Sequence, residues 1–497
     1  MADKMAILAK DTAIYGLSSI IGRFLNYLLF PIHTAFIAST TGGYGIVTHL
    51  YAYAALLFVL LTFGMETTFF RFANKDGNDG RMVYSTALRL VGGVGLVFLI
   101  VVFSFLKPIA NFIGYSDHPE YIGCFAIIGA LDAFQAIMFS HLRQQHRPFK
   151  FLFLKMAFIV PNVILNVFVF WIIPKMFTAM PVLQEIYVRY DNGVGLIFFV
   201  NLICTLIVTA GFAGEIKGIG FGFDKKMSLK MLSYAWPILL LGIIGILPQV
   251  FDKIIYNKLV PGDEGRIQLG LYGACVKIAM IMSLLTQAFR YAYEPLVFGA
   301  SKDKDSDETM ALGMKYFVIF AVLAFLAVMF YLPILKFLVA DRGYWVGLKV
   351  IPIVMMGEIF MGIYFNLSFW YKLSDQTWWG AIMSSIGTLV MITINVLFVP
   401  QKGYIACAWG GFAGYAVCML LSYFIGQQKS RVRYPLAEIG AYILLAGILY
   451  AVSRLCLSLP VWLQLTINTI LILVYLAYLI KKDLPLKSIP VIGKYFK

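Results

Sequence analysis

Charged side chains inside long apolar segments are the residues of this 497-residue sequence that could do chemistry. The first such segment, residues 11–37, carries Arg23 near its midpoint. An arginine at the centre of a membrane helix is disfavoured by about 2.5–3.5 kcal/mol on translocon-insertion scales, so it is not expected to face lipid. Residues at three- and four-residue steps form a stripe along one side of this helix: Thr12, Gly16, Ser19, Arg23, Asn26, Phe30 and His33. The stripe is predicted to face protein or a water-filled cavity.

Three further cations, Arg290, Lys253 and Lys277, also lie within apolar segments. Each has a structural explanation that competes with a functional one. Glu294 follows Arg290 by four residues, so the two could simply pair on one helix face. Lys253 adjoins Asp252, and both lysines lie nearer the ends of their segments, where a long side chain can reach the membrane surface.

Carboxylates inside the apolar segments raise the question of energy coupling. Asp132 and Glu358 lie near the middle of their segments, and Asp252 is the third candidate. A carboxylate in a membrane readily takes up a proton or binds a cation, and either behaviour suits ion exchange. The alternative is a carboxylate satisfied by a hydroxyl or arginine of a neighbouring helix. Asn162 and Asn166 are predicted to make interhelical hydrogen bonds.

The composition identifies a polytopic membrane protein. Hydrophobic residues make up 61% of the chain and charged residues 13%, against about 25% charged in soluble domains. The net charge of +15 does not indicate nucleic acid, because the lysines and arginines lie mainly in short connections between apolar segments. The six cysteines lie in apolar segments without metal or redox spacing and are predicted to be small buried residues.

Apolar windows of about 20 residues predict about fourteen transmembrane helices in an all-α fold. The predicted spans are 11–37, 46–72, 84–107, 120–145, 149–173, 194–214, 231–256, 269–298, 310–338, 345–371, 378–399, 403–425, 438–456 and 460–480. Most lysines and arginines fall on one side when both termini are placed in the cytoplasm, which favours that topology. No connection is long enough to be an independent domain; the longest external one is roughly 174–193.

The seventh and eighth spans weakly repeat the first and second. Arg23 and Asn26 precede Tyr44-Gly45 by about the same distance as Gln249 and Asp252 precede Tyr272-Gly273. Repeats separated by six spans have the same orientation, which predicts two lobes related by an axis along the membrane normal. We expect an N-terminal lobe over 1–215, a C-terminal lobe over 216–430, and an accessory helix pair with a tail over 431–497.

Several runs of residues carry a family resemblance. They are G-Y-G-I-V-T-H-L at 43–50, F-G-M-E-T-T-F-F-R-F at 63–72, W-P-I-L-L-L-G at 236–242, D-K-I-I-Y at 252–256, L-Y-G-A-C-V-K at 271–277 and Y-E-P at 293–295. The sequence resembles polysaccharide and oligosaccharide-lipid exporters, whose superfamily also holds multidrug extruders and lipid II flippases. Fourteen spans resemble the polysaccharide and lipid II branches, because multidrug extruders usually have twelve.

The resemblance implies a flippase of the bacterial cytoplasmic membrane that works by alternating access. Its expected cargo is an undecaprenyl-diphosphate-linked oligosaccharide, moved from the cytoplasmic to the external leaflet. Such a cargo needs a wet, cationic cavity for its head, and Arg23 with Asn26 and Arg290 fits that need because guanidinium binds phosphate oxygens bidentately. Lys253 and Lys277 would receive the diphosphate after the switch. Replacement of Arg23 by alanine is predicted to abolish translocation while the protein still inserts and folds.

No cofactor is expected, and no ATP-binding G-x-x-x-x-G-K-[ST] motif is present. Coupling to protons, sodium or the membrane potential is left open by the sequence, as are the glycan and the oligomeric state. The expected partners are the lipid-linked cargo, membrane lipids and polysaccharide-assembly proteins, without nucleic acid.

Two other functions compete with this hypothesis. A multidrug or small-cation exporter of the same superfamily should favour carboxylates in its cavity, and a central arginine argues against it. A membrane glycosyltransferase or polymerase usually needs a substantial external loop or an acidic metal-binding motif. The acidic run 302–308 mixes both charges in a predicted cytoplasmic connection, so we do not expect an enzyme.

Overall fold

The computed structural model describes Tyr27 and residues 29–75, 77, 79–217, 224–300 and 306–483, and these residues form helices and connections without a strand. Thirteen helical segments in this part of the chain are long and apolar enough to cross a membrane. They coincide with the second to fourteenth predicted spans, from Gly43–Ala73 to Val461–Lys482. The all-helical, polytopic fold class is confirmed. The first predicted span lies mostly outside the described residues, so the count of fourteen stays a prediction.

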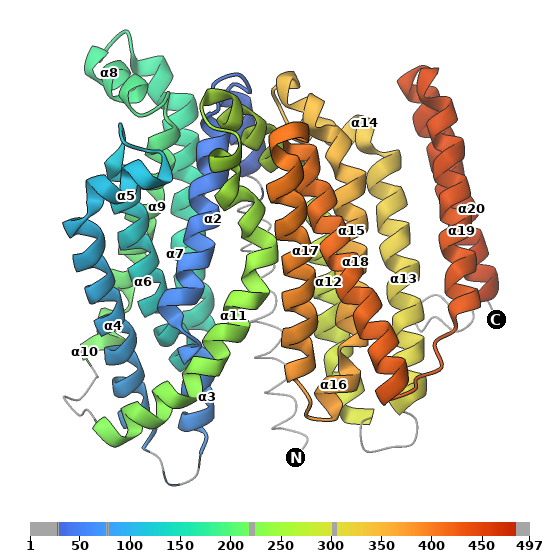
Figure 1. Ribbon diagram of the computed structural model, residues 1–497. Helices are drawn as coiled ribbons and strands as arrows, with labels where there is room; N and C mark the ends of the chain where they lie inside the picture. Colours follow the sequence, from blue (N-terminus) through green and yellow to red (C-terminus); the bar gives the residue numbers. More distant parts are fainter. Residues whose placement is uncertain are drawn as a thin grey trace. The chain divides into compact units, whose positions relative to one another are not determined.

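Figure 1 shows the course of these helices. The first half of the chain forms α2 (Gly43–Thr62), α3 (Met65–Ala73), α4 (Gly80–Ser104), α5 (Leu106–Ile113), α6 (Pro119–Gln144), α7 (Pro148–Val167), α8 (Pro181–Arg189), α9 (Val194–Gly211), α10 (Ala213–Lys217) and α11 (Lys225–Leu259). The second half forms α12 (Asp263–Ala300), α13 (Ser306–Phe330), α14 (Leu332–Leu335), α15 (Ile351–Leu367), α16 (Phe369–Leu373), α17 (Trp378–Lys402), α18 (Tyr404–Lys429), α19 (Leu436–Leu455) and α20 (Val461–Lys482). Short π- and 3₁₀-helical turns extend four of them: η1 (Phe168–Ile172) and η2 (Ile173–Met176) after α7, η3 (Lys336–Leu338) after α14, η4 (Arg342–Val350) before α15 and η5 (Cys456–Ser458) after α19.

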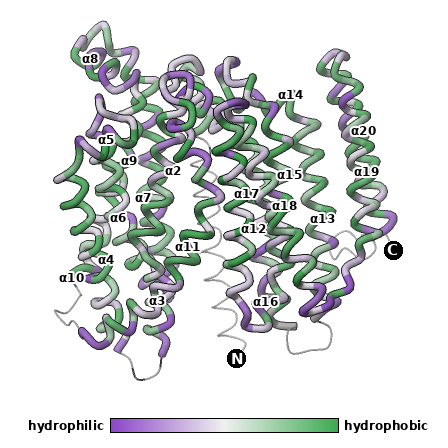
Figure 2. Tube along the Cα trace, viewed as in Figure 1, coloured by the Kyte–Doolittle hydropathy of each residue, from purple (hydrophilic) through white to green (hydrophobic). Residues whose placement is uncertain are grey.

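Local sequence signals explain where several helices begin. Helices α6, α7 and α8 each begin with a proline, which suits the first helical position because its missing N–H would be unpaired there anyway. Asp79 caps α4 and Asp224 caps α11, each accepting hydrogen bonds from backbone N–H groups of the first turn. Between α2 and α3, Phe63 and Gly64 adopt left-handed backbone angles and interrupt the helix. Figure 2 shows apolar residues along the membrane-spanning helices and polar residues mainly at their ends and in the connections.

The chain divides into two compact units, residues 1–273 and 274–497. In the first unit, α11 packs against α2, α3 and α4. The seventh span therefore belongs with the N-terminal helices in this structure, together with the first turns of α12. The expected lobes at 1–215, 216–430 and 431–497 stay a prediction about the pseudo-symmetric architecture.

The two Tyr-Gly pairs of the sequence repeat lie in helices that touch within the first unit. A Cβ on Gly45 of α2 would lie 1.9 Å from the backbone oxygen of Arg266 in α12. A Cβ on Gly273 of α12 would lie 2.1 Å from Thr48 Oγ1 of α2. Real Cβ contacts are never this short, so both positions require glycine for the helices to approach.

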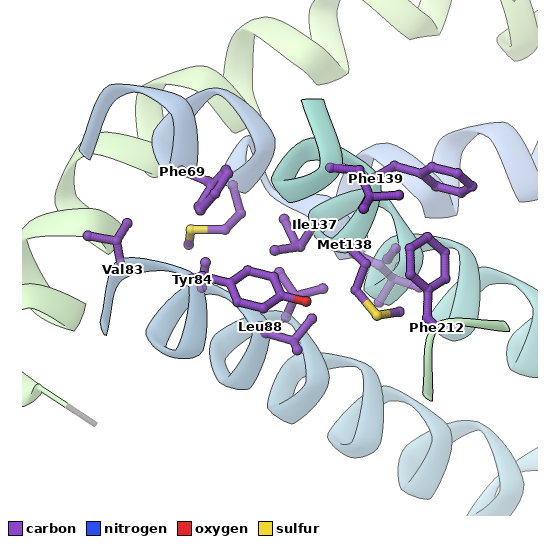
Figure 3. Packing of buried hydrophobic residues seen from close by; sticks show 14 of the residues in the cluster. Phe69, Val83, Tyr84, Leu88, Ile137, Met138, Phe139 and Phe212 are labelled. Carbon is purple, nitrogen blue, oxygen red and sulfur yellow. The ribbon is translucent and has the colours of Figure 1, made fainter. Parts of the chain in front are cut away.

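The core of the first unit lies where α3, α4, α6 and the end of α9 meet. Figure 3 shows the packing of its aromatic and aliphatic side chains, among them Phe69, Val83, Tyr84, Leu88, Ile137, Met138, Phe139 and Phe212. The ring of Tyr84 stacks on His141 with centroids 3.8 Å apart. This core fixes one end of α6, the helix that carries Asp132, Gln135 and Arg143.

In the second unit, α13 packs against α15, α19 and α20. Polar side chains fix the last helix on α13: Asn468 Nδ2 donates to the Phe330 oxygen at 2.9 Å, and Tyr475 OH donates to the Ile319 oxygen at 3.0 Å. Such hydrogen bonds fix helix register in a membrane, where apolar contacts do not discriminate between partners.

A cluster of charged residues joins the same helices at one end. Lys315 of α13 pairs with Glu438 of α19 and with Asp483, the residue that ends α20. Tyr442 OH of α19 also donates to the Asp483 carboxylate. We call Lys315, Glu438, Asp483 and Tyr442 the accessory-pair clamp.

Candidate functional site

Arg23 and Asn26, the centre of the predicted cargo site, lie outside the residues that the structure describes, so their role stays a prediction. The far end of their stripe is described. His33 is 7% exposed, and its Nε2 lies 2.9 Å from Asn166 Oδ1 in α7. Asn166 Nδ2 in turn donates to Asn162 Oδ1 at 2.8 Å. The predicted interhelical role is confirmed for Asn166, whereas the bond to Asn162 lies within α7, and this end of the stripe faces protein.

Asp252 and Lys253 come together at the end of α11. Asp252 is 4% exposed, and Lys253 Nζ lies 3.0 Å from its Oδ1. Tyr272 OH, from the first turns of α12, donates to Asp252 Oδ2 at 2.8 Å. Lys253 Nζ also donates to the Gln249 backbone oxygen at 2.7 Å. The carboxylate is thus held by a cation and a phenol, and its role in ion coupling stays a prediction.

Arg290 forms the ion pair that its spacing from Glu294 allows. Its Nε lies 3.0 Å from Glu294 Oε1, one helical turn further along α12. The Arg290 side chain is 45% exposed, so this pair contributes at most about 1 kcal/mol to stability. The guanidinium of Arg290 therefore lies in an accessible position in the last part of α12 and is not buried in the core.

Lys372, at the end of α16, joins this pair from another helix. Its Nζ lies 3.9 Å from the same Glu294 Oε1. Both cations also stack on Phe365 of α15: Arg290 Cζ lies 4.0 Å from the ring centroid and Lys372 Nζ 4.2 Å. We call Arg290, Glu294, Lys372 and Phe365 the two-cation cluster. It carries two positive charges against one carboxylate.

The two remaining candidates are Lys277 of α12 and Glu358 of α15. Both side chains are half-buried. Glu358 follows Gly357, where α15 approaches the backbone of α18 so closely that a Cβ would lie 3.3 Å from Phe412 Cα. The proposed roles of Lys277 in cargo binding and of Glu358 in ion coupling stay predictions.

Asp132 is half-buried in α6 and interacts with Lys155 of α7 and Thr205 of α9. Gln135, almost one turn further, donates to the Thr205 oxygen at 2.9 Å and to Thr209 Oγ1 at 2.8 Å. Lys155 of α7 interacts electrostatically with Asp132 and has its Nζ 4.1 Å from the Phe139 ring centroid. The Lys155 cation balances the charge of the ionised Asp132 carboxylate, so this carboxylate can be held as an anion inside the membrane. Its role in ion coupling stays a prediction.

Sequence reasoning missed three of these residues: Tyr272, Lys372 and Lys155. Each acts on a residue 20 or more positions away, so no local spacing reveals it. Lys372 and Lys155 were visible only as cations close to the ends of predicted spans, a position that the topology rule already accounts for. Among the described residues, no group of three or more His, Cys, Asp or Glu side chains is arranged to hold a metal ion.

The first part of the chain matches the sequence model of a known protein family. A family model described as polysaccharide biosynthesis protein matches residues 8–292, more than half of the chain. The chain belongs to this family. Among curated proteins, no sequence matches this member of the family.

Solved structures show the fold of this family member. The structure of the lipid II flippase MurJ in an inward closed conformation is similar with a TM-score of 0.72 and 14% identity, covering 94% of this chain and 99% of that chain. An inward-facing multidrug resistance MATE family transporter of the MOP superfamily has a TM-score of 0.62 and 13% identity, covering 81% and 93%. The MATE multidrug transporter DinF-BH, solved with a bound ligand, has a TM-score of 0.57 and 16% identity, covering 85% and 96%.

The exporter resemblance of the sequence motifs is confirmed by these comparisons. The fold is shared with a lipid II flippase and with multidrug transporters, one of which is described as a member of the MOP superfamily. MurJ is matched over almost the whole of both chains, whereas the MATE structures leave a larger part of this chain unmatched.

Proposed function

We propose that this protein flips an undecaprenyl-diphosphate-linked oligosaccharide from the cytoplasmic to the external leaflet of a bacterial cytoplasmic membrane by alternating access. The observation that carries the proposal is membership of the polysaccharide biosynthesis family on a fold shared with the lipid II flippase MurJ. The accessible cations of the two-cation cluster support an anionic head group. The expected partners are the lipid-linked cargo, membrane lipids and polysaccharide-assembly proteins.

The physical requirements of such a cargo agree with the residues available. A diphosphate with a hydrated glycan needs cations it can reach and an aqueous path through the membrane. Arg290 is accessible in α12. Arg23 and Asn26, in the expected N-terminal lobe, are predicted to face the same cavity. Lys253 and Lys277 are proposed to receive the diphosphate after the switch, which for Lys253 requires release from Asp252.

For energy coupling we propose proton or sodium exchange at Asp132, Glu358 or Asp252, or a contribution from the membrane potential. Asp132 faces Lys155 across the α6–α7 contact, so a proton or sodium ion that binds its carboxylate would compete with this lysine. The membrane potential contributes about 2.3 kcal/mol per charge per 100 mV. An imposed proton gradient should change the flipping rate of the wild type and leave that of Asp132→Asn unchanged.

A multidrug exporter is the second candidate, favoured by the MATE structures that share the fold. Efflux measured with a cationic dye and flipping measured with a polyprenyl-diphosphate oligosaccharide separate the two functions in one preparation of proteoliposomes. We expect flipping without dye efflux. Dye efflux without flipping would replace the flippase proposal.

A further inference from the structure

The two cations of the two-cation cluster compete for one carboxylate oxygen. Arg290 Nε and Lys372 Nζ lie 3.0 Å and 3.9 Å from the same atom, Glu294 Oε1. Arg290 is bonded to Glu294 through Nε, which leaves the forked Nη end of the guanidinium as the part suited to phosphate oxygens. The single negative charge of Glu294 is thus shared by two positive charges.

The cluster has packed aromatic side chains on one side, its back, and accessible charged side chains on the other side, its front. On the back, Tyr293 of α12 packs edge-on against Phe369 of α16 with ring centroids 5.5 Å apart, and both side chains are buried. Tyr293 OH donates to the Thr309 backbone oxygen at 3.0 Å, which ties α12 to α13. On the front, the side chains of Arg290, Glu294 and Lys372 are 45%, 27% and 24% exposed.

Further cations surround the same hydrophobic cluster. The connection from α18 to α19 has no regular secondary structure, and burial alternates along it: Val432 and Tyr434 pack on the cluster that contains Tyr293, while Arg431 and Arg433 are exposed. Arg431 and Arg433 therefore add two exposed positive charges at this end of the second unit, which is predicted to be cytoplasmic, and Asp307 interacts with Tyr434 there.

We propose that Arg290 and Lys372 form the capture site for the diphosphate of the cargo, and that Glu294 is an internal counter-anion that the diphosphate displaces. The inference rests on the proposed function and deepens it. A diphosphate diester carries two negative charges, which match the two cations once Glu294 has moved away. Before capture, Glu294 keeps the cations close together on Phe365 and lowers their attraction for monovalent anions.

Binding to the purified protein in nanodiscs of neutral phosphatidylcholine tests this inference. The probes are geranylgeranyl diphosphate, geranylgeranyl monophosphate and inorganic pyrophosphate, titrated by calorimetry. The wild type should bind the diphosphate lipid at least tenfold more tightly than the monophosphate lipid. Pyrophosphate alone should also bind, because the head is what the site recognises; failure of pyrophosphate to compete with the diphosphate lipid would contradict the assignment.

Three variants decide between capture and a merely structural ion pair. Lys372→Met should weaken diphosphate binding about tenfold, and Lys372→Arg should restore most of it. Glu294→Gln should strengthen diphosphate binding severalfold, an effect that a structural salt bridge would not produce. Lys402→Met, an exposed lysine at the end of α17, is the control for loss of one positive charge. Thermal unfolding confirms that each variant is folded.

The outcomes separate this inference from the proposed function. Unchanged or weaker diphosphate binding in Glu294→Gln, or equal losses in Lys372→Met and Lys402→Met, overturns the capture site. If the wild type still flips a diphosphate-linked oligosaccharide in that case, the proposed function stands without it. If the wild type neither binds nor flips any diphosphate lipid, the proposed function fails first.

Discussion

At the scale of residues, the charges in the membrane segments fall into two kinds. Asp252 is buried and already satisfied by Lys253 and Tyr272, whereas Arg290 is accessible and shares its carboxylate with Lys372. A buried, fully bonded pair resists change, and an exposed pair exchanges partners easily. We therefore assign first contact with cargo to the accessible kind.

Spacing in the sequence predicts one of these contacts and misses the other. The four-residue step from Arg290 to Glu294 predicts their pairing, because side chains four apart meet on a helix. The contacts of Lys372 with Glu294 and of Tyr272 with Asp252 depend on how separate helices cross. A single sequence carries no local signal for that crossing.

Tyr272→Phe should destabilise the protein by about 1.5–3 kcal/mol, because the hydroxyl donates to a buried carboxylate. Tyr256→Phe is the matched control, since its equally buried hydroxyl donates to the neutral Gln268 at 2.6 Å and its loss should amount to about 0.5–1.5 kcal/mol. Thermal unfolding of both variants in the same detergent gives the comparison. A smaller effect for Tyr272→Phe than for Tyr256→Phe would show that Asp252 does not depend on this donor.

Arg290→Ala should reduce the initial rate of flipping by about tenfold or more, and Arg290→Lys should retain an intermediate rate, because lysine keeps the charge without the bidentate fork. The rates are measured in proteoliposomes that contain equal amounts of folded protein. Equal rates for Arg290→Ala and the wild type would remove Arg290 from the cargo path.

At the scale of elements, apolar windows predict the positions of thirteen membrane helices within a few residues, because a bilayer fixes their minimum length. The windows do not predict the break at Phe63-Gly64 or the short helix α8 within the 174–193 connection. Both depend on local backbone geometry and on a short segment outside the membrane, to which a 20-residue window is insensitive.

Gly45→Ala should destabilise the packing of α2 on α12 severely, by about 2 kcal/mol or more, because the new methyl group meets the backbone oxygen of Arg266. Gly93→Ala in α4 is the matched control: nothing lies within 4 Å of its new Cβ, and alanine favours a helix by up to about 1 kcal/mol. Thermal unfolding and the yield of monodisperse protein report both effects. Equal stability of the two variants would contradict the close approach of α2 and α12.

The accessory-pair clamp predicts a dependence of stability on pH. Burial by itself raises the pKa of the Asp483 carboxyl, but hydrogen bonds from Lys315 and Tyr442 outweigh it and hold this pKa below its usual value. The clamp therefore stabilises the folded protein above the pH where an unfolded aspartate titrates, about 3.9, and this contribution is lost as the pH falls through the lower, folded pKa.

Asp483→Asn should accordingly lower the unfolding temperature at pH 7 and have progressively less effect below pH 4. Glu438→Gln is the control, because its side chain is 43% exposed and its pair with Lys315 should contribute less. Unfolding temperatures measured from pH 3.5 to 7.5 test both variants. A difference between Asp483→Asn and the wild type that grows on acidification would contradict the clamp.

At the scale of the whole molecule, composition and motifs predict a polytopic exporter fold, and the family match and the MurJ-like fold confirm it. The cargo is not specified at this scale, because a flippase and multidrug transporters share the fold. We propose that specificity depends instead on a few side chains such as Arg23, Arg290 and Lys372. Of these, Arg23 was predicted from its unfavourable position in the membrane, and Lys372 emerged only from the folded structure.

Flipping of a fluorescent polyprenyl-diphosphate oligosaccharide in proteoliposomes tests the central claim most directly. The labelled lipid is followed by its accessibility to a membrane-impermeant quencher, with protein-free liposomes for comparison. We expect the wild type to exchange the label between leaflets much faster than protein-free liposomes do, and to exchange a polyprenyl monophosphate without glycan more slowly. Exchange at the protein-free rate in the presence of folded protein, with or without an ion gradient, would contradict it.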